Sequence, residues 1–436
     1  MKVKVFIKNA VSNIPYSIGH YFTHVPFSWR LGNEYTYSSR DIRQYNNMSA
    51  DEKSAYIVKK LNNIISHASN TFDFYKDLYA EYGVLGSELK CLDDFKKYPI
   101  ITKEMIRKHT NEFNGAMKIN TGGTSGEPLS FFIDKDAFAR EWAHMHSIWS
   151  IKGYNKTDIK ITLRGKNLGN KNIVYNPIHN EFIINTYKSV GSFKNELLDL
   201  FRKYKINYVH GYPSAVYEFF KELEGLVSAE EKHLVTKNII SCFFGSEFPV
   251  HYMIDYLKKR WSLDYISWYG HSEMTILAYD EEKENRYIPF MTYGYSEVED
   301  NKLIGTSYNN FDMPLIRYDT GDIVEGNKNK NGLLEYFSIK EGRKGDFITD
   351  KSGKNIPLTA LIFGRHHKIF DMADFIQVGQ RGVGLVIFYI TLKDRTKIDV
   401  DNLQQYFDLS NIDIAYEFKL QNTPIRSKIG KLKLKV

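Results

Sequence analysis

The sequence predicts an α/β protein with a smaller α+β unit in its carboxyl-terminal part. Between residues 158 and 269, apolar strand-like runs alternate with stretches of helical periodicity. From about residue 285 the pattern changes to short strands joined by polar turns, and the last part of the chain again combines strands with a helix. Strand–turn–helix repetition of the first kind is typical of sheets whose ligand sites lie at the strand ends.

The elements can be placed in order from periodicity and turn residues. The first long helix is expected from about Ala50, and another from Lys103 with Thr102 as its N-cap. Further helices are predicted over 136–151, 195–204, 215–223, 250–260 and 400–407. Strands are predicted over 129–133, 159–163, 208–212, 238–244, 265–269, 314–318, 333–338, 347–348, 384–392 and 413–420. Residues 327–332 are rich in Asn, Lys and Gly, which indicates a hairpin turn.

Length and composition narrow the class of protein. The chain has 436 residues, of which 42% are hydrophobic, so it can bury a large core, and this length favours roughly two or three domains. A net charge of +7 suits anionic substrates such as nucleotides and does not call for nucleic acid. Cys91 and Cys242 are too few for a structural zinc site and fit a reducing compartment. Because neither a membrane span nor a signal peptide is evident, a cytoplasmic protein is expected.

Residues 1–35 form a basic and aromatic segment, in which the basic residues all precede the first acidic residue, Glu34. Its lysines and arginine are Lys2, Lys4, Lys8 and Arg30, and its aromatic residues include Tyr16, Tyr21, Phe22, Phe27 and Trp29. Such a segment could rest weakly on an anionic membrane surface, at the inner face of the membrane. The alternative is a strap packed on the main domain, which is favoured because few charges are involved.

The strongest functional signal is the stretch N-T-G-G-T-S-G-E-P from Asn120 to Pro128. Glycine allows backbone N–H groups to approach a ligand closely, and hydroxyl side chains add donors. This chemistry suits a loop that cradles phosphate oxygens. The Gly-Lys-Ser/Thr ending of a Walker A loop and the spacing of a dinucleotide fingerprint are both missing. An ordinary Gly/Ser turn is the alternative interpretation.

Four further stretches stand at predicted strand ends or turns. They are Gly245-Ser246-Glu247, Tyr269-Gly270-His271-Ser272-Glu273, Tyr318-Asp319-Thr320-Gly321-Asp322 and Gly342-Arg343-Lys344-Gly345-Asp346, followed near the end by Gly430-Lys431. Each is weak alone, but their order together with the glycine loop resembles the adenylate-forming superfamily of acyl-CoA synthetases, adenylation domains and luciferases. Within it the chain looks most like the phenylacetate–CoA ligase branch, which includes the CapK-like capsular polysaccharide proteins. The resemblance covers roughly residue 55 to the end.

The resemblance implies a site for ATP and Mg²⁺. The phosphates would be held by Thr121, Gly122, Gly123, Thr124, Ser125 and Gly126. The adenine pocket would be formed by Gly245, Ser246, Glu247, Tyr269 and Gly270, with Tyr269 stacked on the base. Asp322 would accept the ribose hydroxyls, supported by Arg343. Glu273 would hold Mg²⁺, and the catalytic residues would be Lys431, Glu273 and Thr121.

These residue types suit the chemistry. When a carboxylate attacks the α-phosphate, two anions meet, and Mg²⁺ at Glu273 with the Lys431 ammonium would offset the charge that develops. Asp322 is a double acceptor that suits a vicinal diol. Purely structural roles are the alternatives: Asp322 as a turn residue, Tyr269 as a core aromatic, and Lys431 as a solvent-facing residue of an amphipathic strand. His210 and His271 are expected to be structural, and Trp268 could line the acid pocket.

The implied organisation is an extension over 1–50, a large ATP- and acid-binding domain over 51–342, and a small mobile domain over 343–436 that carries Lys431. The expected reaction is activation of a carboxylic acid to an acyl-adenylate, followed by transfer to coenzyme A or to a sugar amine or hydroxyl in surface polysaccharide synthesis. Two departures from the superfamily are Leu129, where many members have lysine, and a poorly matching hinge over 349–354. The alternative is a catalytically silent relative that acts as a binding or scaffold subunit; a nucleic-acid binder is disfavoured, because no recognisable module is present.

Overall fold

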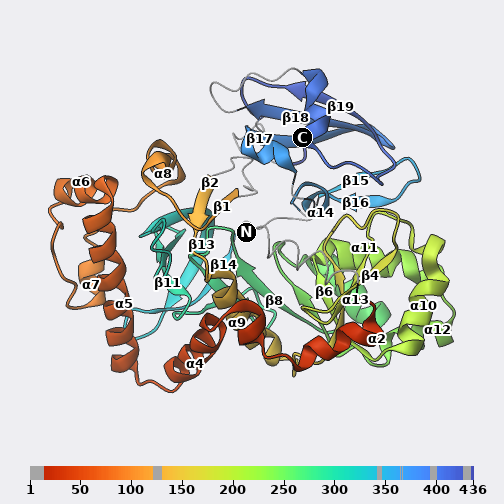
Figure 1. Cartoon of the computed structure of the whole chain (residues 1–436), viewed down its shortest axis with the longest axis horizontal. Coiled ribbons are helices and arrows are strands. Elements are labelled where there is room, and N and C mark those ends of the chain that lie inside the picture. The colour runs from red at the N-terminus through yellow and green to blue at the C-terminus, as the bar shows by residue number, and fades with distance from the viewer. Residues whose placement is uncertain are drawn as a thin grey trace.

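The computed structural model describes residues 14–120, 130–340, 346–363, 365, 367–392, 400–425 and 434–436 (Figure 1). An eight-stranded mixed sheet occupies the middle of the chain, with strand order β10-β9-β8-β7-β6-β3-β5-β4. Strands β5, β3, β6, β7 and β8 run parallel, β4 and β9 flank them in the antiparallel direction, and β10 pairs antiparallel with β9 at the edge. The strands are β3 (Ile159–Leu163), β4 (Ile173–Asn176), β5 (Glu181–Ile184), β6 (Ile206–Gly211), β7 (Ser241–Phe244), β8 (Tyr265–Gly270), β9 (Leu277–Asp280) and β10 (Ile288–Pro289).

Helices cover both faces of this sheet, as the predicted α/β class requires. Alternate strand residues point to opposite faces. Val209 of β6 therefore packs with one group of helices, whereas the neighbouring Tyr208 packs with another helix. The first group contains α10 (Lys194–Lys203), α11 (Pro213–Glu224), α12 (Ala229–Thr236) and α13 (His251–Trp261). The opposite face is covered by α9 (Ala137–Ser150), through Met145, Ile148 and Trp149. The 3₁₀-helix η3 (Val190–Phe193) leads into α10.

A second, antiparallel sheet has the order β11-β12-β13-β14. Its strands are β11 (Gly294–Glu299), β12 (Lys302–Ser307), β13 (Tyr318–Lys328) and β14 (Leu334–Ile339). Their apolar residues share one core with helices from the amino-terminal third of the chain, which include α5 (Ala50–Thr71), α6 (Asp73–Glu81), α7 (Leu92–Phe95) and α8 (Lys103–Lys108). Ser49 and Glu52 form a capping box at the start of α5. The 3₁₀-helix η2 (Thr110–Glu112) follows α8.

The segment before α5 is a helical strap that packs on α9 and on the eight-stranded sheet. Its elements are α2 (Tyr16–Gly19), η1 (His20–His24), α3 (Phe27–Leu31) and α4 (Glu34–Asn46). Tyr16 stacks on Phe182 of β5, with ring centroids 5.6 Å apart. Phe27 and Tyr35 pack against Ala139 and Ala143 of α9. For the described residues of the segment, the strap interpretation is therefore confirmed.

The glycine loop joins the strands of a hairpin, β1 (Met117–Asn120) and β2 (Ser130–Ile133), in which Asn120 pairs with Ser130. Figure 1 shows the carboxyl-terminal strands at the top of the view, above β15, β16 and α14. This part contains β15 (Phe347–Thr349), β16 (Asn355–Pro357), α14 (Leu358–Phe363), η4 (Lys368–Asp371), β17 (Ala373–Gly382), β18 (Leu385–Leu392), η5 (Val400–Tyr406) and β19 (Ala415–Leu420). Its apolar residues form a separate core, which Tyr187 from the segment after β5 joins.

One predicted strand is wrong. The stretch from Pro314 to Arg317 is irregular, and β13 begins only at Tyr318. Arg317 has a φ of +50°, which a strand does not accommodate. Its buried guanidinium is held by Glu297 at 2.8 Å, so side-chain contacts fix this backbone conformation. As a consequence, Asp319, Thr320 and Asp322 lie on the first part of a long strand and not in a terminal turn.

Among the described helices, none combines the length and apolar character needed to cross a membrane.

Candidate active site

The predicted adenine-side residues lie at the carboxyl edge of the eight-stranded sheet. Gly245 follows β7 directly, and Tyr269 and Gly270 end the neighbouring strand β8. Parallel strands place such residues side by side at one edge. A Cβ on Gly245 would lie 2.2 Å from Cε2 of Trp268, so only glycine allows the indole to pack this closely. Ser246 adopts a φ of +67° and is exposed at the edge.

Glu247 is buried next to these residues. One of its carboxylate oxygens accepts a hydrogen bond of 3.1 Å from the backbone N–H of Ser214, at the start of α11. The other oxygen, Oε1, has no hydrogen-bond partner within the described residues. Buried carboxylate oxygens normally have partners. Glu247 therefore holds the start of α11 and presents an unused acceptor beside the strand ends.

Tyr269 and Asp322 connect the two large sheets. The phenol of Tyr269, on β8, donates a hydrogen bond of 2.6 Å to Oδ2 of Asp322, on β13. Burial and the neighbouring Asp322 carboxylate raise the pKa of Tyr269 well above its usual value, so the phenol stays protonated and remains a donor. The ring also packs edge-on against Phe337 at 5.2 Å. The structure thus brings two predicted nucleotide-binding residues together.

Glu273 lies beyond the end of β8, and its carboxylate is enclosed by polar groups. Oε2 contacts Nδ1 of His271 at 3.1 Å, and Oε1 accepts a hydrogen bond of 3.0 Å from the hydroxyl of Tyr318. Burial alone would raise the pKa of this carboxyl. The contact with His271 and the charge of Lys103 more than offset burial, and the pKa falls to about 2. Glu273 is therefore an ionised, oriented oxygen ligand in a buried position.

Lys103 is a site residue that the sequence interpretation did not identify. Its ammonium lies 3.7 Å from Oε1 of Glu273, and its side chain is 21% exposed. The backbone before it is tied to β13, since Ile101 exchanges hydrogen bonds with Arg317 and Asp319. Thr102 caps α8 as predicted, accepting a hydrogen bond from the backbone N–H of Met105. The feature of the sequence that could have pointed to Lys103 is its position immediately after the helix N-cap Thr102.

The fit of Mg²⁺ to this position can be judged from the donors present. Within the described ranges, no group of three or more His, Cys, Asp and Glu side chains could hold a metal ion. Mg²⁺ commonly takes one or two carboxylates and completes its shell with water and phosphate oxygens. The ionised carboxylate of Glu273 fits such a role, in which the substrate phosphates supply further ligands.

Eight of the predicted site residues lie outside the described residues. They are Thr121, Gly122, Gly123, Thr124, Ser125, Gly126, Arg343 and Lys431. Of the described residues next to them in the sequence, Asn120 pairs with Ser130 in the β1–β2 hairpin, and Asp346 directly precedes β15. Lys435 contacts the backbone carbonyl of Phe347, so this lysine of the tail is engaged within the carboxyl-terminal part.

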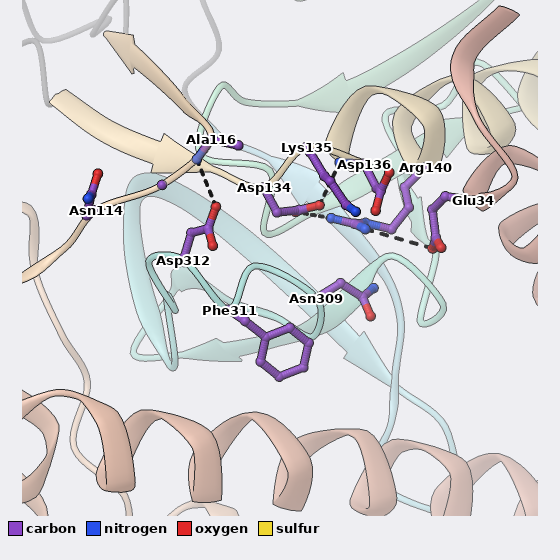
Figure 2. Close-up of a pocket in the computed structure, with 11 residues that line it drawn as sticks. Glu34, Asn114, Ala116, Asp134, Lys135, Asp136, Arg140, Asn309, Phe311 and Asp312 are labelled. Carbon is purple, nitrogen blue, oxygen red and sulfur yellow. Dashed lines mark hydrogen bonds and ion pairs between the residues drawn. The ribbon is translucent and has the colours of Figure 1, made fainter.

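A separate open pocket of about 640 Å³ lies at the base of this hairpin (Figure 2). Its lining includes the carboxylates Glu34, Asp134, Asp136 and Asp312 and the cations Lys135 and Arg140. Figure 2 shows the guanidinium of Arg140 between Asp134 and Glu34, with which it forms ion pairs. Carboxylates outnumber the cations, so this pocket does not suit a nucleotide phosphate. Its ion pairs tie the strap to the hairpin.

The carboxyl-terminal part contacts the eight-stranded sheet and its helices next to the strand ends. The hydroxyl oxygen of Tyr187 lies 2.9 and 2.8 Å from the backbone carbonyl oxygens of Gly165 and Ala360, and its one proton can be donated to either. Lys354, which precedes β16, pairs with Glu222 of α11 at 3.2 Å. These polar contacts place the carboxyl-terminal part at the same edge of the sheet as the candidate site.

Comparison with known proteins agrees with this architecture. No family model matches the chain. Protein CapK of Staphylococcus aureus is 21% identical over 390 residues, which are 81% of this chain and 83% of CapK. A solved structure of 2-hydroxyisobutyryl-CoA ligase with 2-HIB-AMP and CoA, in the thioesterification state, matches with a TM-score of 0.51 at 16% identity, covering 89% of this chain and 90% of that chain. The same ligase with R3-HIB-AMP, in the postadenylation state, matches with a TM-score of 0.50 at 15% identity, over the same shares.

The predicted fold class and the predicted resemblance are both confirmed: the chain shares the α/β fold of 2-hydroxyisobutyryl-CoA ligase and is similar in sequence to protein CapK.

Proposed function

We propose that this protein activates a carboxylic acid with ATP, forms an acyl-adenylate with release of pyrophosphate, and transfers the acyl group to an acceptor. The observation that carries the proposal is the convergence of the Tyr269–Asp322 pair and the Glu273–Lys103 pair at one edge of the sheet. The first pair suits a nucleoside, and the second suits a phosphate with its cation. The fold supports the proposal, because it is shared with a ligase solved with an acyl-AMP bound.

In the first half-reaction, a carboxylate oxygen of the acid attacks the α-phosphorus, and the bond to the pyrophosphate oxygen breaks. Both reactants are anions, so the site must supply positive charge. Lys103 brings one such charge to Glu273 from α8. This matters because Leu129 follows the glycine loop where many superfamily members have lysine. Mg²⁺ held at Glu273 would polarise the phosphate oxygens.

The nucleoside would be bound by the residues at the strand ends. The ring of Tyr269 would stack on adenine, while Gly245, Ser246, Glu247 and Gly270 line the pocket around it. The unpaired Oε1 of Glu247 is an acceptor that suits an exocyclic amine. Asp322 would accept the ribose hydroxyls, with its orientation fixed by the phenol of Tyr269.

Residues outside the described part complete the proposal. The backbone and hydroxyls of Thr121–Gly126 would cradle the β- and γ-phosphates, and Arg343 would support the ribose. Lys431, on a small domain proposed to span residues 343–436, would approach for adenylation, and that domain would move for the transfer step. Residues 51–342 would form the ATP- and acid-binding domain.

In the second half-reaction, a nucleophile attacks the acyl carbonyl and AMP leaves. We propose coenzyme A or a sugar amine or hydroxyl as the acceptor. Coenzyme A is supported by the ligase of the same fold that was solved with CoA. A sugar acceptor, and a place in surface polysaccharide synthesis, is supported by the similarity to CapK.

The strap leaves open a weak association with the inner face of the membrane. Tyr21 and Trp29 are 64% and 80% exposed, on a segment that also carries basic residues. We propose a cytoplasmic protein that binds anionic surfaces weakly through residues 1–35. At low salt, the wild type should float with phosphatidylserine vesicles, and Trp29→Ser should stay in the unbound fraction. Equal flotation of both would contradict a role for this segment.

Acid-dependent ATP–pyrophosphate exchange tests the proposed activation. A panel of aryl, fatty, amino and sugar acids should contain a class that supports exchange in the wild type and not in Glu273→Ala or Lys431→Ala. Exchange that survives Lys431→Ala would remove that lysine from the mechanism. If ATP binds but no acid supports exchange, the catalytically silent alternative, a binding or scaffold subunit, would be favoured.

A further inference from the structure

The open pocket at the base of the β1–β2 hairpin has no role in the proposed acyl activation (Figure 2). Its walls include parts of the chain that are distant in sequence: the strap, the segment that leads from β2 into α9, and the loop after β12. Four carboxylates and two cations line it, which gives the pocket a net charge of −2. Its volume of about 640 Å³ is in the range of pockets that bind small organic ligands.

One of the two cations is already balanced inside the pocket. The guanidinium of Arg140 forms ion pairs with Asp134 and Glu34, and Figure 2 shows it between these two carboxylates. Asp136 precedes α9 but does not cap the helix through its side chain, so the helix does not use this carboxylate. The excess negative charge is therefore available to a ligand, and it favours a cationic one.

A smaller chamber of about 20 Å³ adjoins the open pocket. The two cavities share Asp134, Arg140 and Asn309 in their walls. A volume of this size has room for one group as large as a water molecule. The walls of the chamber also include Met274, which directly follows Glu273 in the chain. The chamber therefore extends the pocket to a residue that neighbours the candidate active site.

Two buried oxygen atoms in the walls of this chamber have no hydrogen-bond partner within the described residues. They are Oγ of Ser307 and Oδ1 of Asn310, residues that are 3% and 7% exposed. The amide of Asn310 is oriented, because its Nδ2 donates a hydrogen bond of 2.8 Å to the backbone carbonyl of Phe132. Its oxygen is left as an acceptor. Buried polar atoms without partners are unusual, so the chamber suits a ligand group that donates hydrogen bonds.

An ammonium group fits this chamber better than a metal ion does. Within the ranges that the structure describes, no group of three or more His, Cys, Asp and Glu side chains could hold a metal ion. An ammonium group is about as large as a water molecule, carries a positive charge, and has three donors and no acceptor. It therefore matches both the unpaired oxygens of the chamber and the net charge of the pocket.

The open pocket offers contacts of a different kind. The side chains of Asn114, Asn309 and Asp312 line it, and their amide and carboxylate groups can bind hydroxyl groups. The ring of Phe311 also lines it and is 36% exposed, so it offers an apolar surface to a ring of carbon atoms. A ligand that fills both cavities would thus combine an ammonium group with a hydroxylated ring.

We propose that the pocket and its chamber bind a hydroxylated primary amine of the amino-sugar class. The ammonium group enters the chamber and donates hydrogen bonds to Ser307 and Asn310. The hydroxylated ring lies in the open pocket against Phe311, where the carboxylate of Asp136 offsets the charge of the ligand. This site goes beyond the proposed function and does not depend on it, because other side chains form it.

Calorimetric titration of the whole protein tests the site in the absence of ATP and acid. Glucosamine, galactosamine and mannosamine are the amino sugars, whereas glucose lacks the ammonium group and cyclohexylamine lacks the hydroxyl groups. We expect at least one amino sugar to bind. Glucose and cyclohexylamine should bind at least about tenfold more weakly, because each lacks one of the two kinds of group that the site recognises.

Variants assign the binding to the pocket. Ser307→Ala removes an unpartnered hydroxyl, so it should weaken binding of the amino sugar roughly three- to tenfold, while the unfolding temperature stays unchanged or rises. Asp136→Asn removes a charge from the open pocket and should weaken binding about tenfold. Asp199→Asn, at an exposed carboxylate that pairs with Arg202, is the control and should bind the amino sugar as the wild type does.

Several results would overturn the inference. They are equal binding of glucose or cyclohexylamine, wild-type affinity in both Ser307→Ala and Asp136→Asn, and no binding of any of the three amino sugars. A lower unfolding temperature of Ser307→Ala would also contradict it, because the hydroxyl would then have a partner in the free protein. None of these results bears on acyl activation, which the pyrophosphate-exchange reaction tests separately.

Discussion

The phenol of Tyr269 donates a 2.6 Å hydrogen bond to the carboxylate of Asp322, and this bond joins the end of β8 to β13. The two sheets thereby meet at this pair of side chains, in addition to the backbone pairing of Tyr287 with Phe337 and the hydrogen bond from Tyr318 to Glu273. The pair fixes where a base and a ribose would bind relative to the strand ends. It also means that a change in either residue acts on the nucleotide site and on the contact between the sheets.

Removing the charge of Asp322 should weaken nucleotide binding. Asp322→Asn keeps the shape and one acceptor oxygen, but loses a charged acceptor, which is commonly worth about 1.5–3 kcal/mol. We expect ATP to bind at least about tenfold more weakly by calorimetry. Asp319→Asn is the matched control, since Asp319 lies on the same strand and pairs with Lys302. If the two variants bind ATP equally well, Asp322 does not contact the ribose.

Lys103 should affect the chemical step. Lys103→Met removes the cation beside Glu273, and loss of one group that stabilises transition-state charge commonly costs about 10²–10³ in kcat. We expect such a loss in the exchange rate, with a smaller change in the KM for the acid. Lys108→Met, five residues further along and exposed in a pair with Glu104, should leave both parameters unchanged. A kcat near that of the wild type in Lys103→Met would exclude the proposed role.

Glu273 should make the free energy of unfolding depend on pH in the acid range. Its folded-state pKa is about 2, below its ordinary value of 4.5, because His271, Tyr318 and Lys103 surround the ionised form. The stabilisation, about 3 kcal/mol by linkage, is present above pH 4.5 and is lost as the pH falls toward 2. Urea unfolding between pH 6 and pH 3 should therefore show a shallower loss in Glu273→Gln than in the wild type. Parallel curves for the two proteins would show that this carboxyl titrates normally.

The packing of Trp268 on Gly245 predicts a steric effect. Gly245→Ala would place Cβ 2.2 Å from the indole, so the ring or the strand end must move, at a cost of about 1–3 kcal/mol. Thermal unfolding should show the loss, and the additional change Trp268→Leu should recover most of it. Gly225→Ala is a suitable control, because its Cβ would meet no atom closer than 3.9 Å. Full stability of Gly245→Ala alone would contradict the observed packing.

Local signals in the sequence predicted much of the fold. The predicted strand over 159–163 coincides with β3, and Thr102 caps α8 as expected. Turn residues over 327–332 predicted the β13–β14 hairpin, where Gly332 has a φ of +78°. Each of these features depends on residues close in sequence. The same strand pattern placed Gly245, Tyr269 and Glu273 near one edge, because parallel strands align their ends.

Features that depend on distant contacts were not predicted. The irregular path through Arg317 depends on Glu297, which lies on another strand. Lys103 becomes a site residue only because α8 packs where Glu273 follows β8. Strands β4 and β5, of four residues each, were not predicted.

The central claim is that a carboxylate oxygen of the acid attacks the α-phosphorus of ATP. Incubation with ATP and an acid labelled with ¹⁸O in its carboxyl group tests this directly, by mass spectrometry of the products after acyl transfer or hydroxylamine quench. The account predicts AMP that carries one ¹⁸O atom, together with unlabelled pyrophosphate. Formation of ADP with ¹⁸O in inorganic phosphate would contradict it, because the attack would then have taken place at the γ-phosphorus.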